Sequence, residues 1–392
     1  MKENLLLKNT TFLRVWFANM LTDFGGIFFE VMIIWYLVSN RESALVVGGF
    51  IIISLVGELL GNALISQVVD FTDTKKLMAS IDALRMILFI FSFLMIEHVM
   101  NHLLLLYGIS LMVSFLDGSY LVTRRKSIPE IVSKENLVQA NGLDGVAASL
   151  VRIGSWGLSA VLILTISLEA TFLLNIGTAL VALVIILSAK WASQKTLENA
   201  DKVQFIEGIK IIRRYKNICQ IIRAETIFFL LMGLFWVAFP FKAGAIGDGV
   251  TYALHGAIFG IGWLILSLFL SHRKSQSKTS LMYRLGIGAY AFGNVFVALA
   301  SSPWVFLLGI FITGLGTAFW EAGKNTLFHL TVPTNEVGKV FSVFGTLTNG
   351  VMIPATIIGG FLLDRFDLLM VMGVIAGLQV IPMVMLGKVR EG

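Results

Sequence analysis

The feature that most constrains this chain is a succession of apolar runs, each long enough to cross a lipid bilayer. Apolar residues make up 57% of the sequence and charged residues only 14%, whereas soluble domains are close to half apolar. Backbone groups find no water in hydrocarbon, so these runs must be helices, and the fold class is an all-α membrane protein. A span needs about 20 mainly apolar residues, and we expect twelve spans, near residues 15–38, 45–69, 77–97, 103–122, 138–164, 171–190, 224–241, 250–270, 281–300, 304–326, 339–362 and 368–387.

Both halves of the chain carry the same landmarks at an offset of 204 residues. Repeats at this scale are typical of secondary transporters, so we expect two pseudo-symmetric six-helix bundles, at residues 1–190 and 224–392. The stretch between them, 191–223, places apolar residues at roughly helical spacing with lysine and arginine between them, which predicts an amphipathic linker on the cytoplasmic face. The matching landmarks are Leu77-Met78 with Leu281-Met282, Pro129 with Pro333, and Asp117 with Glu321.

The positions of lysine and arginine predict the orientation of the chain. These residues gather at both ends and in the even-numbered loops between the expected spans. Short loops rich in lysine and arginine stay in the cytoplasm, so we expect both termini to be cytoplasmic, in the plasma membrane of a bacterium. The net charge of +6 is then a signal of topology, and nucleic acid is not expected as a partner.

Several chemistries are disfavoured by the residue content. The one cysteine, Cys219, cannot form an intrachain disulfide, and we expect no metal site and no cofactor. The stretch AFWEAGKN at 318–325 departs from the phosphate-binding pattern G-x-x-x-x-G-K-[ST], so ATP is not expected as the direct energy source. The five histidines are scattered along the chain, which argues against a membrane-embedded enzyme.

Two kinds of loop motif resemble those of the major facilitator superfamily. Between the second and third expected spans the chain reads SQVVDFTDTKK, in which Asp70, Lys75 and Lys76 match the family pattern G-x-x-x-D-R-x-G-R-K. The stretches SIPEIVSKENLVQANGLDG at 127–145 and TVPTNEVGKVFSVFG at 331–345 are similar to the macrolide-efflux branch of its drug:proton antiporters. The resemblance implies the twelve-helix major facilitator fold and alternating access. The antiporter pattern G-P-x-x-G-G is replaced by GSWG at 154–157, which leaves the coupling mechanism open.

Charged residues within the spans are the candidates for proton coupling, because a charge in hydrocarbon costs at least about 2.5 kcal/mol. Asp23 lies near the middle of the first span, Glu30 follows two turns later on nearly the same face, and Glu58 lies in the second span. Arg152 keeps its charge and needs an acidic partner, for which Asp23, Glu30 and Asp117 are candidates. The alternatives are that Glu30 faces water at the outer rim, and that Glu58 and Arg152 only hold helices together.

A second group of charges implies, by the same resemblance, a cytoplasmic gate. In the family, an acid in the fourth helix bridges to the basic end of the loop between helices 2 and 3. Direct substrate contact is the alternative for this acid, and Asp144 and Glu225 are interpreted as favourable charges near helix starts. The implied gating contacts join Asp117 to Lys75 or Lys76 beside Asp70, and Glu321 to Arg273 or Lys274.

Aromatic residues crowd the helices that line the central cavity in the resembled fold. Aromatic faces beside carboxylates suit an amphipathic, often cationic ligand, although aromatic residues also face lipid in any membrane protein. The candidate substrate-binding residues are Asp23, Phe24, Phe28, Glu30, Phe235, Trp236, Phe239 and Trp320.

Together these patterns predict a secondary transporter that exports a small amphipathic compound, such as a drug, antibiotic or siderophore-like metabolite, in exchange for protons. Uptake by proton or sodium symport and lipid flipping are the alternatives, and a monomer is expected. The coupling acids have no counterparts at the 204-residue offset, because Asp23, Glu30 and Glu58 fall on apolar residues or glycine of the second half. The chemistry is therefore expected to be concentrated in the N-terminal half.

Overall fold

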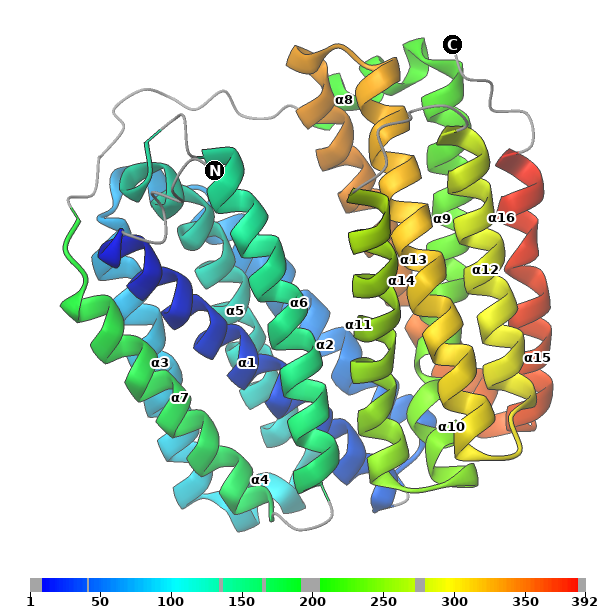
Figure 1. The fold of residues 1–392 in the computed structure, drawn as a ribbon. Helices are drawn as coiled ribbons and strands as arrows, with labels where there is room; N and C mark the ends of the chain where they lie inside the picture. Colours follow the sequence, from blue (N-terminus) through cyan, green and yellow to red (C-terminus); the bar gives the residue numbers. More distant parts are fainter. Residues whose placement is uncertain are drawn as a thin grey trace. The chain divides into compact units, whose positions relative to one another are not determined.

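The computed structural model describes residues 9–40, 42–133, 137–163, 167–191, 205–271 and 279–386, and these residues are overwhelmingly helical (Figure 1). Contacts divide the chain into two compact units: unit 1 is Met1–Ile34 with Phe50–Asn199, and unit 2 is Trp35–Gly49 with Ala200–Gly392. The segment 35–49 thus groups with the second unit, although the sequence suggested one continuous N-terminal bundle to residue 190.

Unit 1 is built from seven α-helices and a short 3₁₀ helix among its described residues. Its core lies where α3 packs on both α7 and α5, and Figure 1 shows α3 and α7 side by side. The start of α3 is fixed by Asp73, whose side chain accepts the Lys76 N–H at 3.0 Å. The elements are α1 (Thr10–Ser39), α2 (Ala44–Ile65), η2 (Val69–Phe71), α3 (Thr74–Leu94), α4 (Ile96–Asn101), α5 (Leu103–Ile131), α6 (Leu137–Leu162) and α7 (Leu168–Ser188). The C-terminal end of α1 and the start of α2 belong to unit 2.

Unit 2 has an aromatic core formed by α9, α12, α13 and α14. In this unit α12 lies against α13 and α15, and α9 lies against α14. The described helices are α8 (Phe205–Arg214), α9 (Lys216–Trp236), α10 (Ala238–Ile246), α11 (Gly249–Ser271), α12 (Thr279–Leu299), α13 (Pro303–Thr331), α14 (Thr334–Arg365), α15 (Leu368–Leu378) and α16 (Val380–Met385).

The helices agree with the expected spans, and the all-α fold class is confirmed. Among the described residues, eleven helical segments are long and apolar enough to cross a membrane, and α6 adds a shorter apolar stretch at Val146–Leu162. The main difference concerns α5, which continues to Ile131 and contains Pro129 in its last turns. Pro333, its expected counterpart, instead precedes α14 as the N-cap, so the two prolines are not structurally equivalent.

The repeat is real in three dimensions, but one fixed offset does not describe it. The helices α3 and α12 start 205 residues apart, whereas α5 and α13 start 200 residues apart. The difference arises because unit 1 inserts the short helix α4 between α3 and α5, while α12 and α13 are joined by three residues. The offset of 204 therefore misaligns α5 with α13, and the counterpart of Asp117 is Thr317, not Glu321.

Two glycines demonstrate this alignment through close contacts between backbones. A methyl group at Gly57 of α2 would lie 2.6 Å from the carbonyl oxygen of Leu111 in α5, and one at Gly262 of α11 would lie 2.5 Å from that of Phe311 in α13. Gly57 and Gly262 are 205 residues apart, and Leu111 and Phe311 are 200 residues apart. The same helix crossing is thus built in both units, and only glycine permits it.

The expected linker contains a helix that packs onto unit 2. Ile211 and Ile212 of α8 are buried, and Glu336 of α14 accepts from Arg214 Nη1 and from the Tyr215 hydroxyl, both at 3.3 Å. The next helix, α9, begins at Lys216, eight residues before the predicted start of the span. Residues 192–204 lie outside the described part of the chain.

Candidate functional site

The site centres on a buried arginine in α3 of unit 1. The Arg85 side chain is 3% exposed and forms an ion pair with Asp117 of α5, whose side chain is 34% exposed. Arg85 Nη1 also donates to the backbone oxygen of Thr22 at 3.3 Å. The pair lies against α1 at Gly26, where an added methyl group would be 3.0 Å from Arg85 Nη2 and 3.1 Å from Asp117 Oδ2. The absence of a side chain at Gly26 makes room for this ion pair.

A second carboxylate shares this arginine. Asp82 lies one turn before Arg85 on α3 and is completely buried, and the charge of Arg85 acts on it. Asp82 Oδ1 accepts from the Thr22 hydroxyl at 3.2 Å, whereas Oδ2 has no hydrogen-bond partner among the described residues. Two acids and one guanidinium carry a net charge of −1 when ionised, so binding one proton makes the group neutral.

Neither Asp82 nor Arg85 was predicted from the sequence as a functional residue, although the signal was present. They stand three residues apart in the run IDALR, within the expected span 77–97. Charged residues inside a span are expensive and face the bundle interior, so an opposite pair at this spacing indicates a polar face of the helix. Asp117 was identified, but its partner was not.

In this structure Asp117 is paired with Arg85 and not with the loop lysines, so the expected bridge stays a prediction. Lys75 Nζ donates to the Ala189 carbonyl oxygen at 2.6 Å, and Lys76 is exposed. Both lysines lie in the first turn of α3, about 14 Å along the helix axis from Arg85 at 1.5 Å per residue. Arg85 therefore reaches Asp117 at a depth that the lysines do not share.

The remaining gating candidates are described only in part. Asp70 lies in η2, and its side chain is outside the described set. Arg273 and Lys274 fall in 272–278, which the structure does not describe. Glu321 lies on α13 and is partly buried, and its charge acts on Glu225 of α9. The expected bridge from Glu321 to this loop is thus untested.

Asp23 lies in a second ion-pair group, which is centred on Arg124 toward the C-terminal end of α5. Arg124 Nη1 contacts Asp23 Oδ2 at 2.6 Å, and Arg124 Nη2 contacts Asp144 Oδ2 of α6 at 3.7 Å. Arg124 is largely buried, with 11% of its side chain exposed, so it links α1, α5 and α6. Asp144 was interpreted only as a favourable charge near a helix start, but the structure also gives it an ion-pair partner, Arg124.

Glu30 and Glu58 are exposed in the structure. The charges of Glu58, Asp117 and Arg152 all act on Glu30, in that order of strength. Glu30, one of the three partners suggested for Arg152, is therefore within its electrostatic reach. Glu30 and Glu58 are thus within electrostatic reach of Asp117, whereas Asp23 is paired with Arg124.

The candidate aromatic residues divide into buried and exposed groups. Phe28 and Phe235 are almost completely buried, and Phe28 stacks on Phe24 with ring centroids 6.0 Å apart. Phe239 is also buried and packs against Phe235 at 5.2 Å, whereas Trp236 is 42% exposed. Buried side chains contribute to the helix packing, so Phe24 and Trp236 are the members of this set with accessible surface.

Trp320 belongs to a buried polar cluster in unit 2 that the sequence analysis did not identify. Glu225 of α9 is completely buried, and its Oε1 accepts from Tyr283 Oη at 2.5 Å and from Trp320 Nε1 at 2.6 Å. Lys324 Nζ lies over the rings of Trp320 and Phe344, 4.8 and 4.7 Å from their centroids. Glu225 is therefore a buried acid held by hydrogen bonds in the interior of unit 2. This corrects its interpretation as a favourable charge near a helix start.

The corrected alignment makes this cluster the counterpart of a contact in unit 1. The helices α1 and α9 start 206 residues apart, which pairs Asn19 with Glu225, while the 200-residue offset pairs Tyr120 with Trp320. In unit 1 the Tyr120 hydroxyl donates to Asn19 Oδ1 at 3.0 Å. The same offset pairs Arg124 with Lys324. Each unit thus carries a buried polar contact and a basic residue at matching positions, so charged chemistry is not confined to the N-terminal half.

The described residues contain no cluster of histidine, cysteine and carboxylate side chains that could hold a metal ion. The polar groups in both units are carboxylates, guanidinium or ammonium groups, hydroxyls and amides within membrane-length helices. Such groups can bind or release protons and can attract a charged solute.

A family model described as Major Facilitator Superfamily matches residues 15–355. Macrolide efflux protein A of Streptococcus pyogenes is 22% identical over 379 residues, which cover 90% of this chain and 89% of that protein.

Solved structures show the same fold at low sequence identity. The nucleoside transporter NupG has a TM-score of 0.77 at 13% identity, over 96% of this chain and 98% of that one. A bacterial homologue of the iron transporter ferroportin, in an inward-facing state, has a TM-score of 0.72 at 13% identity, also over 96% and 98%.

Proposed function

The chain belongs to the major facilitator superfamily, and from that premise we propose that this transporter exports a small amphipathic compound in exchange for protons by alternating access. The cargo class is a drug, an antibiotic or a siderophore-like metabolite. Similarity to macrolide efflux protein A over most of both chains supports export. The lysine and arginine pattern supports a bacterial plasma membrane location with both termini in the cytoplasm.

The observation that carries the proton-coupling proposal is the group Asp82, Arg85 and Asp117. Arginine keeps its charge at any physiological pH, so the two acids decide whether the group is negative or neutral. Asp82 Oδ2 has no hydrogen-bond partner among the described residues, which makes it a position for a proton. Asp117 is one-third exposed and offers a path between that position and water.

Proton uptake would loosen the contact between α3 and α5. When Asp117 is ionised it holds Arg85 against α1, and when it takes up a proton Arg85 retains only Asp82 and the Thr22 carbonyl group. A charged pair whose strength depends on a proton gives the transporter two arrangements that a pH gradient can bias. Substrate and protons would then favour opposite arrangements, as exchange requires.

The other candidates take supporting roles in this scheme. Asp23, Glu30, Glu58 and Arg152 form the surrounding charge field that would attract a cationic cargo. Phe24 of unit 1 and Trp236 of unit 2 are the aromatic candidates with accessible surface. Phe28, Phe235, Phe239 and Trp320 are buried, and each would support the packing of its own unit. Lys75, Lys76, Arg273, Lys274, Asp70 and Glu321 remain the candidates for the cytoplasmic gate.

The test is transport by the purified protein in proteoliposomes with an imposed pH gradient. The panel contains macrolides and other amphipathic cations, and an imposed sodium gradient replaces the pH gradient in a parallel series. We expect accumulation driven by the pH gradient in the wild type. We expect it to be abolished in Asp82→Asn and Asp117→Asn and retained in Glu97→Gln, which removes an exposed acid of α4.

Three outcomes would contradict the proposal. Movement of the cargo in the same direction as protons would indicate symport. Accumulation driven only by a sodium gradient would mean that sodium, and not the proton, is the coupling ion. Full coupling in both aspartate variants would remove the Arg85 group from the mechanism. Facilitated equilibration of cargo in these variants, without accumulation, is the result that the proposal requires.

A further inference from the structure

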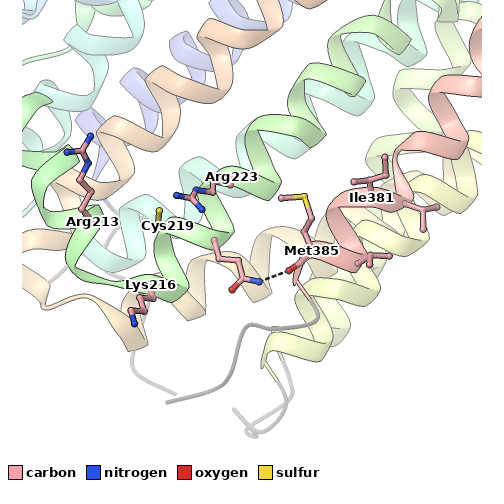
Figure 2. A pocket seen from close by; sticks show the side chains of 9 residues that line it. Arg213, Lys216, Cys219, Arg223, Ile381 and Met385 are labelled. Atoms are coloured by element: carbon pink, nitrogen blue, oxygen red, sulfur yellow. Dashed lines mark hydrogen bonds between the residues drawn. The ribbon is translucent and has the colours of Figure 1, made fainter.

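A pocket with a basic rim lies at the end of unit 2 that carries α8. Its volume is about 780 Å³, and it is lined by the end of α8, the first turns of α9 and the helix α16. Figure 2 shows Arg223 and Cys219 on one wall facing Ile381 and Met385 on the other. The two walls are joined where Gln220 Nε2 donates to the Met385 carbonyl oxygen at 2.5 Å.

One wall of the pocket carries three cations, Arg213, Lys216 and Arg223. All three are exposed, and none forms an ion pair with an acid among the described residues. Lys216 and Arg223 are seven residues apart on α9, which places them on nearly the same face with about 10 Å between their backbone positions. The neighbouring Arg214, by contrast, is paired with Glu336, so the three rim cations are not needed to anchor α8.

The opposite wall is apolar and open. Val380, Ile381 and Val384 of α16 line the pocket and are 43%, 44% and 71% exposed. They belong to the candidate span Leu368–Met385, where exposed apolar side chains contact lipid acyl chains. The candidate span of α9 starts at Lys216, so the cations lie at the end of the span, where headgroups meet hydrocarbon.

The occupant must therefore combine an anionic group with an apolar tail. An inorganic anion would satisfy the cations but leave the α16 wall uncovered. An amphipathic cation would be repelled by three like charges, which separates this pocket from the acid-rich site of unit 1. Basic pockets at the ends of membrane helices bind lipid headgroups, and each basic residue contributes about 1 kcal/mol.

We propose that this pocket binds an anionic phospholipid, with its phosphate at Arg213, Lys216 and Arg223 and an acyl chain along Val380, Ile381 and Val384. The lipid bridges α8, α9 and α16. It adds to the hydrogen bond from Gln220 that joins α9 and α16 in the pocket. Bound lipid thereby stabilises the junction of the linker with unit 2, independently of the cargo and of the coupling ion.

The test measures lipid binding to the full-length protein in nanodiscs of phosphatidylcholine titrated with phosphatidylglycerol, using native mass spectrometry after mild extraction. We expect phosphatidylglycerol to be retained in preference to phosphatidylcholine. Arg223→Gln should reduce this preference roughly fivefold, and the triple variant Arg213→Gln/Lys216→Gln/Arg223→Gln should reduce it on the order of 100-fold. The matched control is Lys210→Gln, an exposed cation of α8 that does not line the pocket, and it should keep the wild-type preference.

Two further arms test whether the acyl chains are needed for binding and whether the basic residues attract the headgroup by charge. Glycerol phosphate, which has the headgroup charge without acyl chains, should fail to displace the bound lipid at millimolar concentration. In the wild type, raising ionic strength should weaken the preference, because exposed charges are screened. Equal binding of both lipids by the wild type, an effect of Lys210→Gln as large as that of Arg223→Gln, or displacement by glycerol phosphate would overturn the proposal.

Discussion

The ion pair between Arg85 and Asp117 predicts an unequal response to the loss of each partner. Asp117→Asn leaves a buried guanidinium that cannot lose its charge. Removing one partner of a buried pair costs about 3–5 kcal/mol. We expect about 3 kcal/mol, the lower end, because Asp117 is one-third exposed and Asp82 remains near the cation.

Arg85→Met should cost less, about 1–2 kcal/mol, because the stranded carboxylates can take up protons whereas the stranded arginine cannot release one. The double variant should lose about as much stability as Arg85→Met alone, because replacing Arg85 removes the positive charge that Asp117→Asn would leave unpaired. The expected coupling energy between the two sites therefore equals the cost of Asp117→Asn, about 3 kcal/mol. The cost of Arg85→Met should also shrink as pH falls, because protonation of Asp82 and Asp117 removes their unpaired charges.

The assay is unfolding of the detergent-purified protein by titrated sodium dodecyl sulfate, followed by fluorescence of its eight tryptophans. Glu97→Gln, which changes an exposed acid of α4, should alter the free energy of unfolding by less than about 0.5 kcal/mol. Additive effects of Arg85→Met and Asp117→Asn would refute the reasoning. So would a greater cost for Arg85→Met than for Asp117→Asn at neutral pH.

Three other predictions use the same unfolding assay. Gly57→Ala forces a methyl group to within 2.6 Å of a backbone oxygen in α5 and should cost about 1–3 kcal/mol of unfolding free energy. The control Gly177→Ala, where a methyl group would meet no atom within 4 Å, should stabilise the protein slightly. Equal effects of the two changes would contradict the backbone contact. Trp320→Phe removes one hydrogen bond to the buried Glu225 carboxylate and should cost about 1.5–3 kcal/mol of unfolding free energy. Adding Glu225→Gln to this variant should restore part of the loss. An unchanged unfolding free energy in Trp320→Phe would contradict the hydrogen bond. Arg214→Gln should cost no more than about 1 kcal/mol of unfolding free energy, since this arginine is 66% exposed. A larger loss would contradict the expectation that its ion pair with Glu336 is a weak surface contact.

The helices could be predicted from the sequence because hydrocarbon imposes one simple requirement on every span. The alignment of the halves could not, because it depends on where a short insertion falls. The landmark pair Leu77-Met78 and Leu281-Met282 lies in α3 and α12, before the insertion of α4. An offset taken there cannot hold in α5 and α13.

Partners of charged residues were harder to predict than the residues themselves. Asp117 was recognisable as a charge inside an apolar run, but Lys75, Lys76, Arg85 and Arg152 lie at different depths and each could have met it. The choice depends on the rotation of α3 and on the space that Gly26 leaves beside α1. Glu225 was misjudged for a related reason, since its distance from the start of its span depended on a helix boundary that was predicted eight residues too late.

The glycine crossings at Gly57 and Gly262 have a mechanical consequence. Where two backbones touch, no side chain stands between the helices, so no change of rotamer can absorb a shift of one helix along the other. In α2, where Gly57 and Gly61 both lie against α5, a slide by one turn would bring Ile53 or Ile65 to one of these two contacts. In α11 it would bring Ile258 or Leu266 to the position of Gly262. We therefore expect α2 with α5, and α11 with α13, to move as stiff pairs during the transport cycle, with bending confined to the helices that have side chains at their contacts.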